Sequence, residues 1–357
     1  MIPAVEVCID LNALKHNLQR VKQSAPQSKI MAVIKANGYG HGIVRMAQAM
    51  SEADAFVVAR VDEALRLREA GIDKMLVVLE GFFEPADIEL MANQSIQAVI
   101  HHPSQIDVLE HCSLPQPLNV WLKIDSGMHR MGVSAGLAPS AWWRLQDCDA
   151  VDEVRLMTHL ASADEPDSEQ TTKQLACFQA ATAGLVAERS IANSAAILAW
   201  PESHADWVRP GIMLYGVSPF EAQEAQAYDL QPVMTFSSHL IAVNRFREGE
   251  TVGYGATWVC PENMLVGVVS CGYGDGYPRH VAEGVEVLLN GQRVPLIGRV
   301  SMDTLCVDLR SQPQAQIGDK VVLWGSGLPV EEIARKASTI PYELLCRVAA
   351  RVAFRES

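Results

Sequence analysis

The segment from residue 30 to residue 42 brings a primary amine to the end of an apolar run. The run Ile30–Ile34 is typical of a buried strand, and Lys35 follows it directly. Glycines then occupy alternate positions, Gly38, Gly40 and Gly42, which lets the backbone approach a ligand closely. A lysine that is partly desolvated at a strand end has a lowered pKa, which suits Schiff-base chemistry. On spacing alone, a lysine that extends from the strand end into solvent explains the pattern equally well.

Seven more apolar runs follow, and helical stretches separate most of them. This order of elements predicts a (β/α)8 barrel. Such barrels place their chemistry at the C-terminal ends of the strands and often hold phosphate after strands seven and eight. Lys35, His159 and Ser194 close three of the runs, and Arg209-Pro210-Gly211 lies in the last. The expected strands are Ile30–Ile34, Ala55–Ala59, Met75–Leu79, Ile96–Ile100, Leu118–Ile124, Val154–Thr158, Arg189–Ala192 and Val208–Leu214.

Helix signals fit the same alternation. Asp10 can cap a helix that begins at Leu11, and Asp62 can cap a helix that ends before the glycine at position 71. The stretch Ser168–Glu188 reads as the longest helix of the barrel.

The pattern changes near residue 230, where helical periodicity gives way to short β-rich runs. Asn290-Gly291 between two of these runs is a strong signal for a type I′ hairpin. We therefore expect a barrel domain over residues 11–229 and a mostly-β C-terminal domain over residues 230–357, which Val5–Ile9 in the segment 1–10 joins as a strand. The expected C-terminal strands are Phe236–Val243, Leu265–Cys271, Val285–Leu289, Val294–Val300, Thr304–Leu309 and Lys320–Trp324.

Composition narrows the class of protein. At 357 residues, the chain suits one barrel and one smaller domain. A formal net charge of −13 argues against nucleic acid as a partner. No apolar run approaches the roughly 20 residues that span a bilayer, and the N-terminus lacks a signal-peptide profile. The eight cysteines are scattered, so we expect buried reduced thiols, no metal site and a cytoplasmic protein.

Taken singly, the other polar residues near the strand ends have ordinary structural interpretations. Ser194 can be a helix N-cap, Arg209 an ion-pair partner, His159 a core histidine and Tyr254 a loop aromatic. Their surroundings change this view, because an ordered set of motifs from about residue 5 to residue 351 resembles the alanine racemases. The motifs are Ile30–Gly42, Lys123–Gly132, Thr158–Leu160, Asn193–Ala196, Arg209–Gly216, Val252–Thr257, Gly272–Arg279 and Gly298–Asp303.

The resemblance implies pyridoxal 5′-phosphate as the cofactor, with Lys35 as its point of attachment. The residues that resemble the phosphate-binding set are Tyr39, Ser194, the backbone of Gly211 and Ile212, and Tyr342. Arg209 resembles the arginine that faces the pyridine nitrogen. Because an arginine is effectively always protonated, it cannot accept a proton from that nitrogen, and this favours racemisation over transamination.

The resemblance also implies two bases and a shared site. Lys35 would serve the D-side proton and Tyr254 the L-side proton, with His159 orienting Tyr254. Arg130 resembles the arginine near the cofactor phenolic oxygen and the substrate carboxylate, and Lys123 resembles a lysine that many relatives carbamylate to position it. The alternative for Lys123 is an unmodified ammonium paired with Asp125.

Tyr273 and Met302 match substrate-pocket positions that, like Tyr254, come from the partner of a head-to-tail homodimer. The expected reaction is interconversion of L-alanine and D-alanine, either to supply peptidoglycan or for catabolism. Three alternatives stay open: a serine or broad-specificity racemase, a basic amino-acid decarboxylase of the same two-domain plan, and a non-catalytic pyridoxal-phosphate carrier. In the decarboxylases a glutamate usually meets the ring nitrogen, and the carriers lack the β domain.

Overall fold

The structure is a computed structural model that describes residues 4–282 and 284–357. Contacts between residues divide the chain into two units. The barrel unit comprises Asn17–Leu214 and Pro219–Ala222, and the β unit comprises the described residues up to His16, Tyr215–Ser218 and Gln223–Ser357. The boundary between the units in the sequence falls within helix α1 (Leu11–Ser24).

Eight parallel strands close into a barrel, which confirms the predicted fold class. Neighbouring strands pair in the order β2-β3-β4-β5-β6-β8-β9-β10, and β10 pairs back with β2 to close the ring. The short β7 (Val133–Ser134) pairs only with β6. The barrel strands are β2 (Lys29–Val33), β3 (Ala55–Val58), β4 (Met75–Val78), β5 (Ile96–Ile100), β6 (Leu118–Asp125), β8 (Val151–Met157), β9 (Arg189–Ser190) and β10 (Trp207–Val208).

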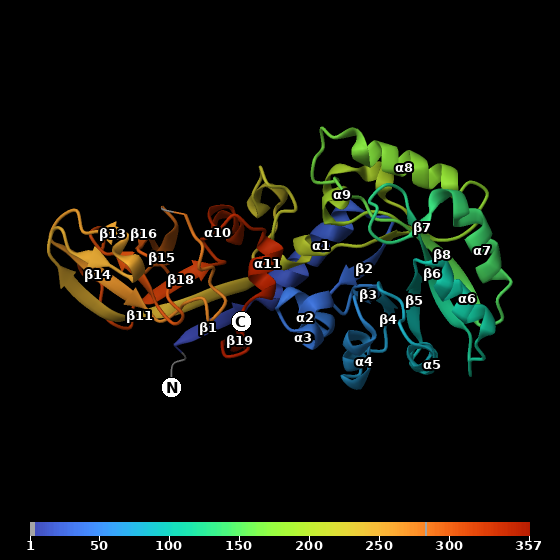
Figure 1. Cartoon of the computed structure of the whole chain (residues 1–357), viewed down its shortest axis with the longest axis horizontal. Helices are drawn as coiled ribbons and strands as arrows, with labels where there is room; N and C mark the ends of the chain where they lie inside the picture. The colour runs from blue at the N-terminus through green and yellow to red at the C-terminus, as the bar shows by residue number, and fades with distance from the viewer. Residues whose placement is uncertain (1–3, 283) are drawn as a thin grey trace. The chain divides into compact units, whose positions relative to one another are not determined.

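Helices follow the strands and lie outside them, where Figure 1 shows α4 to α8. Asp10 caps α1 as predicted, since its carboxylate accepts hydrogen bonds from the backbone N–H groups of Asn12 and Ala13. The helices of the barrel unit after α1 are α2 (Lys35–Tyr39), α3 (Ile43–Ala49), α4 (Val61–Glu69), α5 (Pro85–Asn93), α6 (Pro103–His111), α7 (Ala138–Gln146), α8 (Glu169–Ala181) and α9 (Ser194–Ala199).

Three predictions about elements are wrong. The eighth strand is not Val208–Leu214, because β10 stops at Val208 and proline at position 210 cannot donate to a ladder. The helix predicted over Ser168–Glu188 is α8, which ends at Ala181 and is one residue shorter than α1. Asp62 lies inside the first turn of α4 rather than at its cap.

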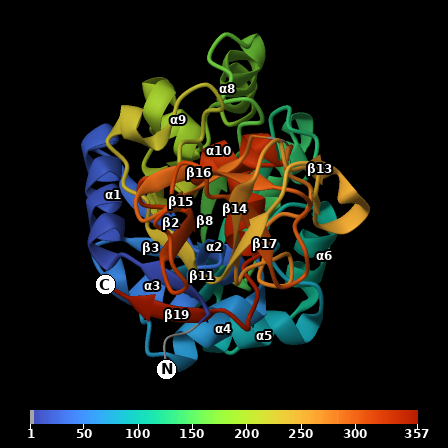
Figure 2. The same ribbon diagram turned by 90° about the vertical axis from the view of Figure 1, so that its left-hand side faces the viewer.

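The β unit is built on an eight-stranded sheet with the order β14-β17-β16-β15-β18-β11-β1-β19. An additional β14–β11 pairing joins the first six of these strands into a ring. The strand β1 (Val5–Ile9) runs antiparallel to β11 and parallel to β19. Figure 2 shows β14, β15, β16 and β17 of this sheet close together. The remaining strands are β11 (Met234–Phe246), β12 (Thr251–Val252), β13 (Trp258–Val259), β14 (Met264–Val269), β15 (Glu286–Leu289), β16 (Gln292–Ile297), β17 (Leu305–Asp308), β18 (Lys320–Trp324) and β19 (Ala353–Glu356).

The predicted hairpin is confirmed. Leu289 pairs with Gln292, so the loop between β15 and β16 has two residues, and both Asn290 and Gly291 have positive φ. The helices of the β unit are α10 (Val330–Lys336) and α11 (Pro341–Cys346). All eight cysteines are free thiols, although only three of them are buried. Within the described residues, every helix is too short or too polar to span a bilayer.

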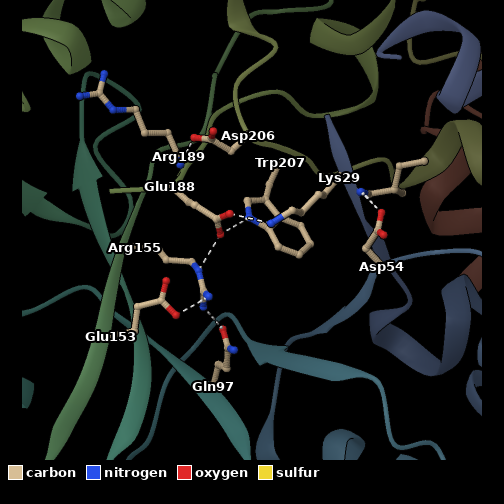
Figure 3. Close-up of polar contacts among 10 residues, drawn as sticks. Lys29, Asp54, Gln97, Glu153, Arg155, Glu188, Arg189, Asp206 and Trp207 are labelled. Carbon is tan, nitrogen blue, oxygen red and sulfur yellow. Dashed lines mark hydrogen bonds and ion pairs between the residues drawn. The ribbon is translucent and has the colours of Figure 1, made fainter. Parts of the chain in front are cut away.

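A charged network, which we call the floor network, fills the N-terminal end of the barrel (Figure 3). Its centre is the carboxylate of Glu188, which accepts hydrogen bonds from Lys29 Nζ at 2.6 Å, Trp207 Nε1 at 2.8 Å and Arg155 Nε at 2.9 Å. Arg155 Nη1 donates in turn to Gln97 Oε1 at 3.2 Å. These bonds tie together β2, β5, β8 and β10 beneath the predicted site.

Glu188 makes the stability of the barrel sensitive to acid. Burial alone raises the pKa of Glu188, but the hydrogen bonds from Lys29, Trp207 and Arg155 outweigh burial and lower it to about 2. Because the folded-state pKa is depressed, this stabilisation is present above the unfolded-state value of about 4.3 and is lost as pH falls toward 2. We expect Glu188→Gln to flatten the pH dependence of the free energy of unfolding between about pH 4.5 and pH 2.

The measurement is urea unfolding of wild type and variant at several pH values. Glu52→Gln is the matched control, because Glu52 also bonds a lysine, Lys22, at 2.6 Å but is exposed. Its curve should run parallel to that of the wild type. Parallel curves for Glu188→Gln would contradict the assignment.

Candidate active site

The chain after Lys35 turns with left-handed backbone. Ala36, Asn37, Gly38 and Tyr39 have φ of 53°, 55°, 63° and 49°, so α2 is a left-handed turn. For residues other than glycine this conformation costs about 1–2 kcal/mol each. Such strain persists only where the surroundings fix it, and it is common at functional sites.

Side chains from outside the turn hold it in place. The buried His41 Nδ1 lies 2.8 Å from Tyr39 O and 3.1 Å from Gly38 O. Burial lowers the pKa of His41 to about 4, so the ring is neutral and Nδ1–H donates. Glu63 Oε1 accepts from Ala36 N at 2.7 Å. These contacts fix the backbone that follows Lys35, and Tyr39 within it is buried.

Four basic side chains meet at the C-terminal end of the barrel. Burial, together with the charges of Arg209, Arg130 and Lys35, lowers the pKa of Lys123 to about 8. Burial and the charges of the same three residues and of Lys123 hold the pKa of His159 well below its usual value. His159 is therefore neutral at pH 7, and the predicted residues Lys35, Lys123, Arg130, His159 and Arg209 share one electrostatic environment.

Arg209 is buried and bonded to the barrel wall through both of its Nη atoms. Its guanidinium donates to Thr158 O at 2.5 Å, Ser190 Oγ at 2.6 Å and Ile191 O at 3.2 Å. Nη2 also donates to His159 Nδ1 at 3.4 Å, which places the single ring proton of His159 on Nε2. Burial lowers the pKa of Arg209 to about 10, so the group stays a cation at neutral pH. Arg209 is therefore a fixed cation, and His159 is a neutral imidazole that carries its proton on Nε2.

Ser194, the first residue of α9, bonds to the backbone segment that follows β10. Its Oγ accepts from Gly211 N at 2.8 Å and from Met213 N at 3.4 Å. The N-cap of α9 is the preceding Asn193, whose side chain accepts from Ala196 N, so Ser194 is not a simple cap. Hydroxyls and N–H groups of this kind can bind phosphate.

Gly211 brings this segment against the left-handed turn. A Cβ at Gly211 would lie 2.7 Å from Tyr39 Oη, so a larger residue would displace the phenol. Ile212 begins a 3-10 turn (Ile212–Tyr215) directly after it, and its backbone N–H lies in the first turn. The predicted phosphate ligands Tyr39, Ser194, Gly211 and Ile212 are thus neighbours in the barrel unit.

The other predicted site residues lie in the β unit. Tyr254, Tyr273 and Met302 are exposed, with 67%, 41% and 54% of their surfaces accessible. Tyr254 begins a 3-10 turn (Tyr254–Ala256), and Tyr342 is the second residue of α11 and is half-buried.

Comparison with known proteins decides the family. The model of "Alanine racemase, N-terminal domain" matches residues 9–219, and that of "Alanine racemase, C-terminal domain" matches residues 233–355. The chain belongs to the alanine racemase family. An alanine racemase from Nitrosococcus oceani is 52% identical over 349 residues, which cover 97% of this chain and 98% of the relative. One from Coxiella burnetii is 50% identical over 354 residues, with 98% and 97% covered.

Solved structures agree with this assignment to an enzyme family. The crystal structure of a biosynthetic alanine racemase from Pseudomonas aeruginosa has a TM-score of 0.97 at 43% identity and covers all of both chains. The alanine racemase from Acinetobacter baumannii has a TM-score of 0.91 at 39% identity, again over all of both chains.

Two residues of this alanine racemase family member contribute to the site without having been predicted. Ser190 accepts a hydrogen bond from Arg209, and Glu63 holds the turn after Lys35. Ser190 has no signal in the sequence, because a serine inside a strand is ordinary. Glu63 stands at a helix start 28 positions after Lys35, so only the folded chain shows the contact.

Proposed function

We propose that this protein interconverts L-alanine and D-alanine with pyridoxal 5′-phosphate as its cofactor. The observation that carries the proposal is the barrel mouth, where a lysine amine, a phosphate-type cradle and the Arg209–His159 pair lie together. The D-alanine would serve peptidoglycan synthesis, or the reaction would run toward catabolism, in a cytoplasmic enzyme.

The residues of the barrel unit fit the cofactor. Lys35 is the amine for its attachment, and Tyr39, Ser194 and the backbone of Gly211 and Ile212 supply neutral donors for its phosphate. The close approach of Gly211 to Tyr39 Oη keeps the cradle free of a side chain at that position. Tyr342 is assigned to this set by resemblance. When bound, pyridoxal phosphate supplies an electron sink for the charge that develops at the substrate Cα.

Arg209 sets how strong that sink is. Its buried guanidinium remains protonated at neutral pH and has no lone pair to offer, so it can only donate to a ring nitrogen. Arg209 would therefore leave a ring nitrogen of the cofactor unprotonated, so the sink would be weaker than one with a pyridinium. Protonation at Cα is then favoured over proton movement to another carbon, which favours racemisation.

Inversion at Cα requires a proton donor and acceptor on each face. We assign the D-side proton to Lys35 and the L-side proton to Tyr254. His159, neutral and anchored by Arg209, orients Tyr254, and Arg130 binds the substrate carboxylate. Tyr254, Tyr273 and Met302 would come from the partner of a homodimer and leave room for a small side chain.

Lys123 is proposed to carry a carbamate. Since its pKa is lowered to about 8, part of the population is a neutral amine at neutral pH, and that amine can add to CO2 with release of one proton. We expect a carbamate resonance in 13C spectra of protein equilibrated with 13C-bicarbonate, growing as pH rises from 6 to about 9. Lys123→Ala should lack the resonance. A resonance of equal size in that variant would contradict the assignment.

A chiral assay tests the function itself. Purified protein with added pyridoxal phosphate is incubated with L-alanine in D2O, and with L-serine, L-lysine and L-arginine in parallel. Fast formation of α-deuterated D-alanine, with the others slow, is the expected result. Release of carbon dioxide would indicate a decarboxylase, and cofactor binding without inversion of any substrate would indicate a carrier.

A further inference from the structure

Two loops of the β unit, which carry Tyr273 and Met302, are joined backbone to backbone. Tyr273 N donates to Ser301 O at 3.1 Å, and Gly274 N donates to Met302 O at 2.8 Å. A Cβ at Gly272 would lie 2.2 Å from Ser301 O, so the chains are in direct contact there. The two side chains therefore extend from one shared backbone platform.

A third segment, from the C-terminal part of the chain, fastens this platform. Ala349 N donates to Asp275 O at 3.0 Å. Arg351 then forms a fork, with Nε donating to Asp275 Oδ1 and Nη2 donating to Asp303 Oδ1, both at 2.7 Å. Asp275 stands two residues after Tyr273, and Asp303 directly follows Met302. One guanidinium therefore links the two loops.

The two arms of the fork differ in strength. Asp275 is buried, and its second oxygen accepts from Gly272 N at 3.0 Å. Asp303 is exposed, so its ion pair alone contributes little. Without Arg351, the Asp275 carboxylate would keep one backbone partner, and water from the adjoining pocket would replace the side-chain link between the two loops. Arg351 itself borders an open pocket that Asp275, Asp303 and Ser270 also line, so shortening it leaves no closed void.

We propose that Arg351 is a positioning residue that fixes the spacing between Tyr273 and Met302 and thereby sets selectivity for a methyl side chain. This inference rests on the proposed function, in which those two residues border the side chain of the substrate. Serine differs from alanine by one hydroxyl, and pockets discriminate such small groups by about 10–200-fold. This discrimination requires that the distance between Tyr273 and Met302 stay fixed.

The β unit contains a matched control. Arg310 joins the buried Asp308 at 2.8 Å and the exposed Glu262 at 2.9 Å, and its own exposure of 43% is close to the 48% of Arg351. It lies past the opposite end of β17 from Met302. Arg310→Ala therefore removes the same kind of fork without touching the two loops.

The experiment compares Arg351→Ala, Arg351→Lys and Arg310→Ala as cofactor-loaded enzymes. The measured quantities are kcat and KM for L-alanine and L-serine, together with thermal stability. Arg351→Ala and Arg310→Ala should both lose thermal stability. Only Arg351→Ala should lower the alanine-to-serine ratio of kcat/KM, by about 5–10-fold and mainly through KM. Arg351→Lys should recover part of the ratio, because an ammonium can reach Asp275 but cannot form the fork.

An unchanged ratio in Arg351→Ala, or an equal fall in Arg310→Ala, would overturn the proposal. If Arg351→Ala does not fold, Arg351→Lys becomes the test. Faster hydrogen exchange in residues 272–277 and 301–303, together with a lowered alanine-to-serine ratio of kcat/KM, supports the proposal. A wild-type ratio overturns it. A wild-type enzyme that does not racemise alanine would instead refute the proposed function. In that case the exchange of the two loops in Arg351→Lys still shows whether Arg351 holds them.

Discussion

Replacing Lys35 with alanine is expected to abolish racemisation and to remove the visible absorbance that the protein acquires with pyridoxal phosphate. Lys35 follows β2 at its C-terminal end, the left-handed turn after it contains no lysine, and Lys29 lies at the opposite end of the strand. The lysine also serves as one of the two proposed bases, so both the attachment and one proton transfer are lost together. Absorption spectra and the D2O assay on the same sample measure the two effects.

Lys123→Ala is the control for this variant. Lys123 lies in the same electrostatic environment, but it is not assigned to attachment. It should lose activity and keep the visible band. If the band instead persists in Lys35→Ala and disappears in Lys123→Ala, the attachment site has been assigned to the wrong lysine.

Tyr254→Phe is expected to slow net racemisation by about 10²–10⁴-fold, the usual contribution of a positioned acid or base. The two enantiomers have equal free energy in water, so both directions must slow alike. D-alanine should still exchange its α-proton with D2O through Lys35, without inversion. Tyr228→Phe, at a half-buried tyrosine outside the site residues, should behave as wild type. Fast exchange of L-alanine in Tyr254→Phe would exclude Tyr254 as the L-side base.

Mixing the two variants tests the proposed dimer. If Tyr254 acts on the partner's barrel, a hybrid of Lys35→Ala and Tyr254→Phe chains contains one site with both defects and one site with neither. Unfolding and refolding the mixture should then restore part of the activity. Failure to restore any activity, in a mixture shown to contain hybrids, would place both bases on one chain.

The barrel could be predicted from sequence because the physical signals are local. Parallel strands buried on both faces read as short apolar runs, and the residue that follows each run must lie at the C-terminal rim. That logic alone placed Lys35, His159 and Ser194 at strand ends. The two-residue hairpin at Asn290-Gly291 followed from the need for positive φ at both positions.

Features that depend on distant partners could not be predicted in this way. Asn37 is a residue type that tolerates left-handed backbone, but Ala36 and Tyr39 give no such signal, because His41 and Glu63 impose that conformation after folding. The eighth strand was predicted too long, because Val208 and the apolar Ile212–Leu214 were read as one run across Arg209-Pro210-Gly211. The fork of Arg351 joins residues 48 and 76 positions away and has no local signature.

The barrel closes through its two shortest strands, and this has a consequence for how cofactor and fold depend on each other. Both β9 and β10 have two residues, so few ladder bonds hold that arc, and Glu188 and Arg209 supply much of the rest through side chains. Local opening should therefore begin there. Ser194, Arg209 and Gly211, the proposed cofactor contacts, flank the same arc. A ligand that binds these residues would stabilise the part of the barrel that opens most easily. The stability of the barrel should therefore increase with the fraction of sites that hold cofactor.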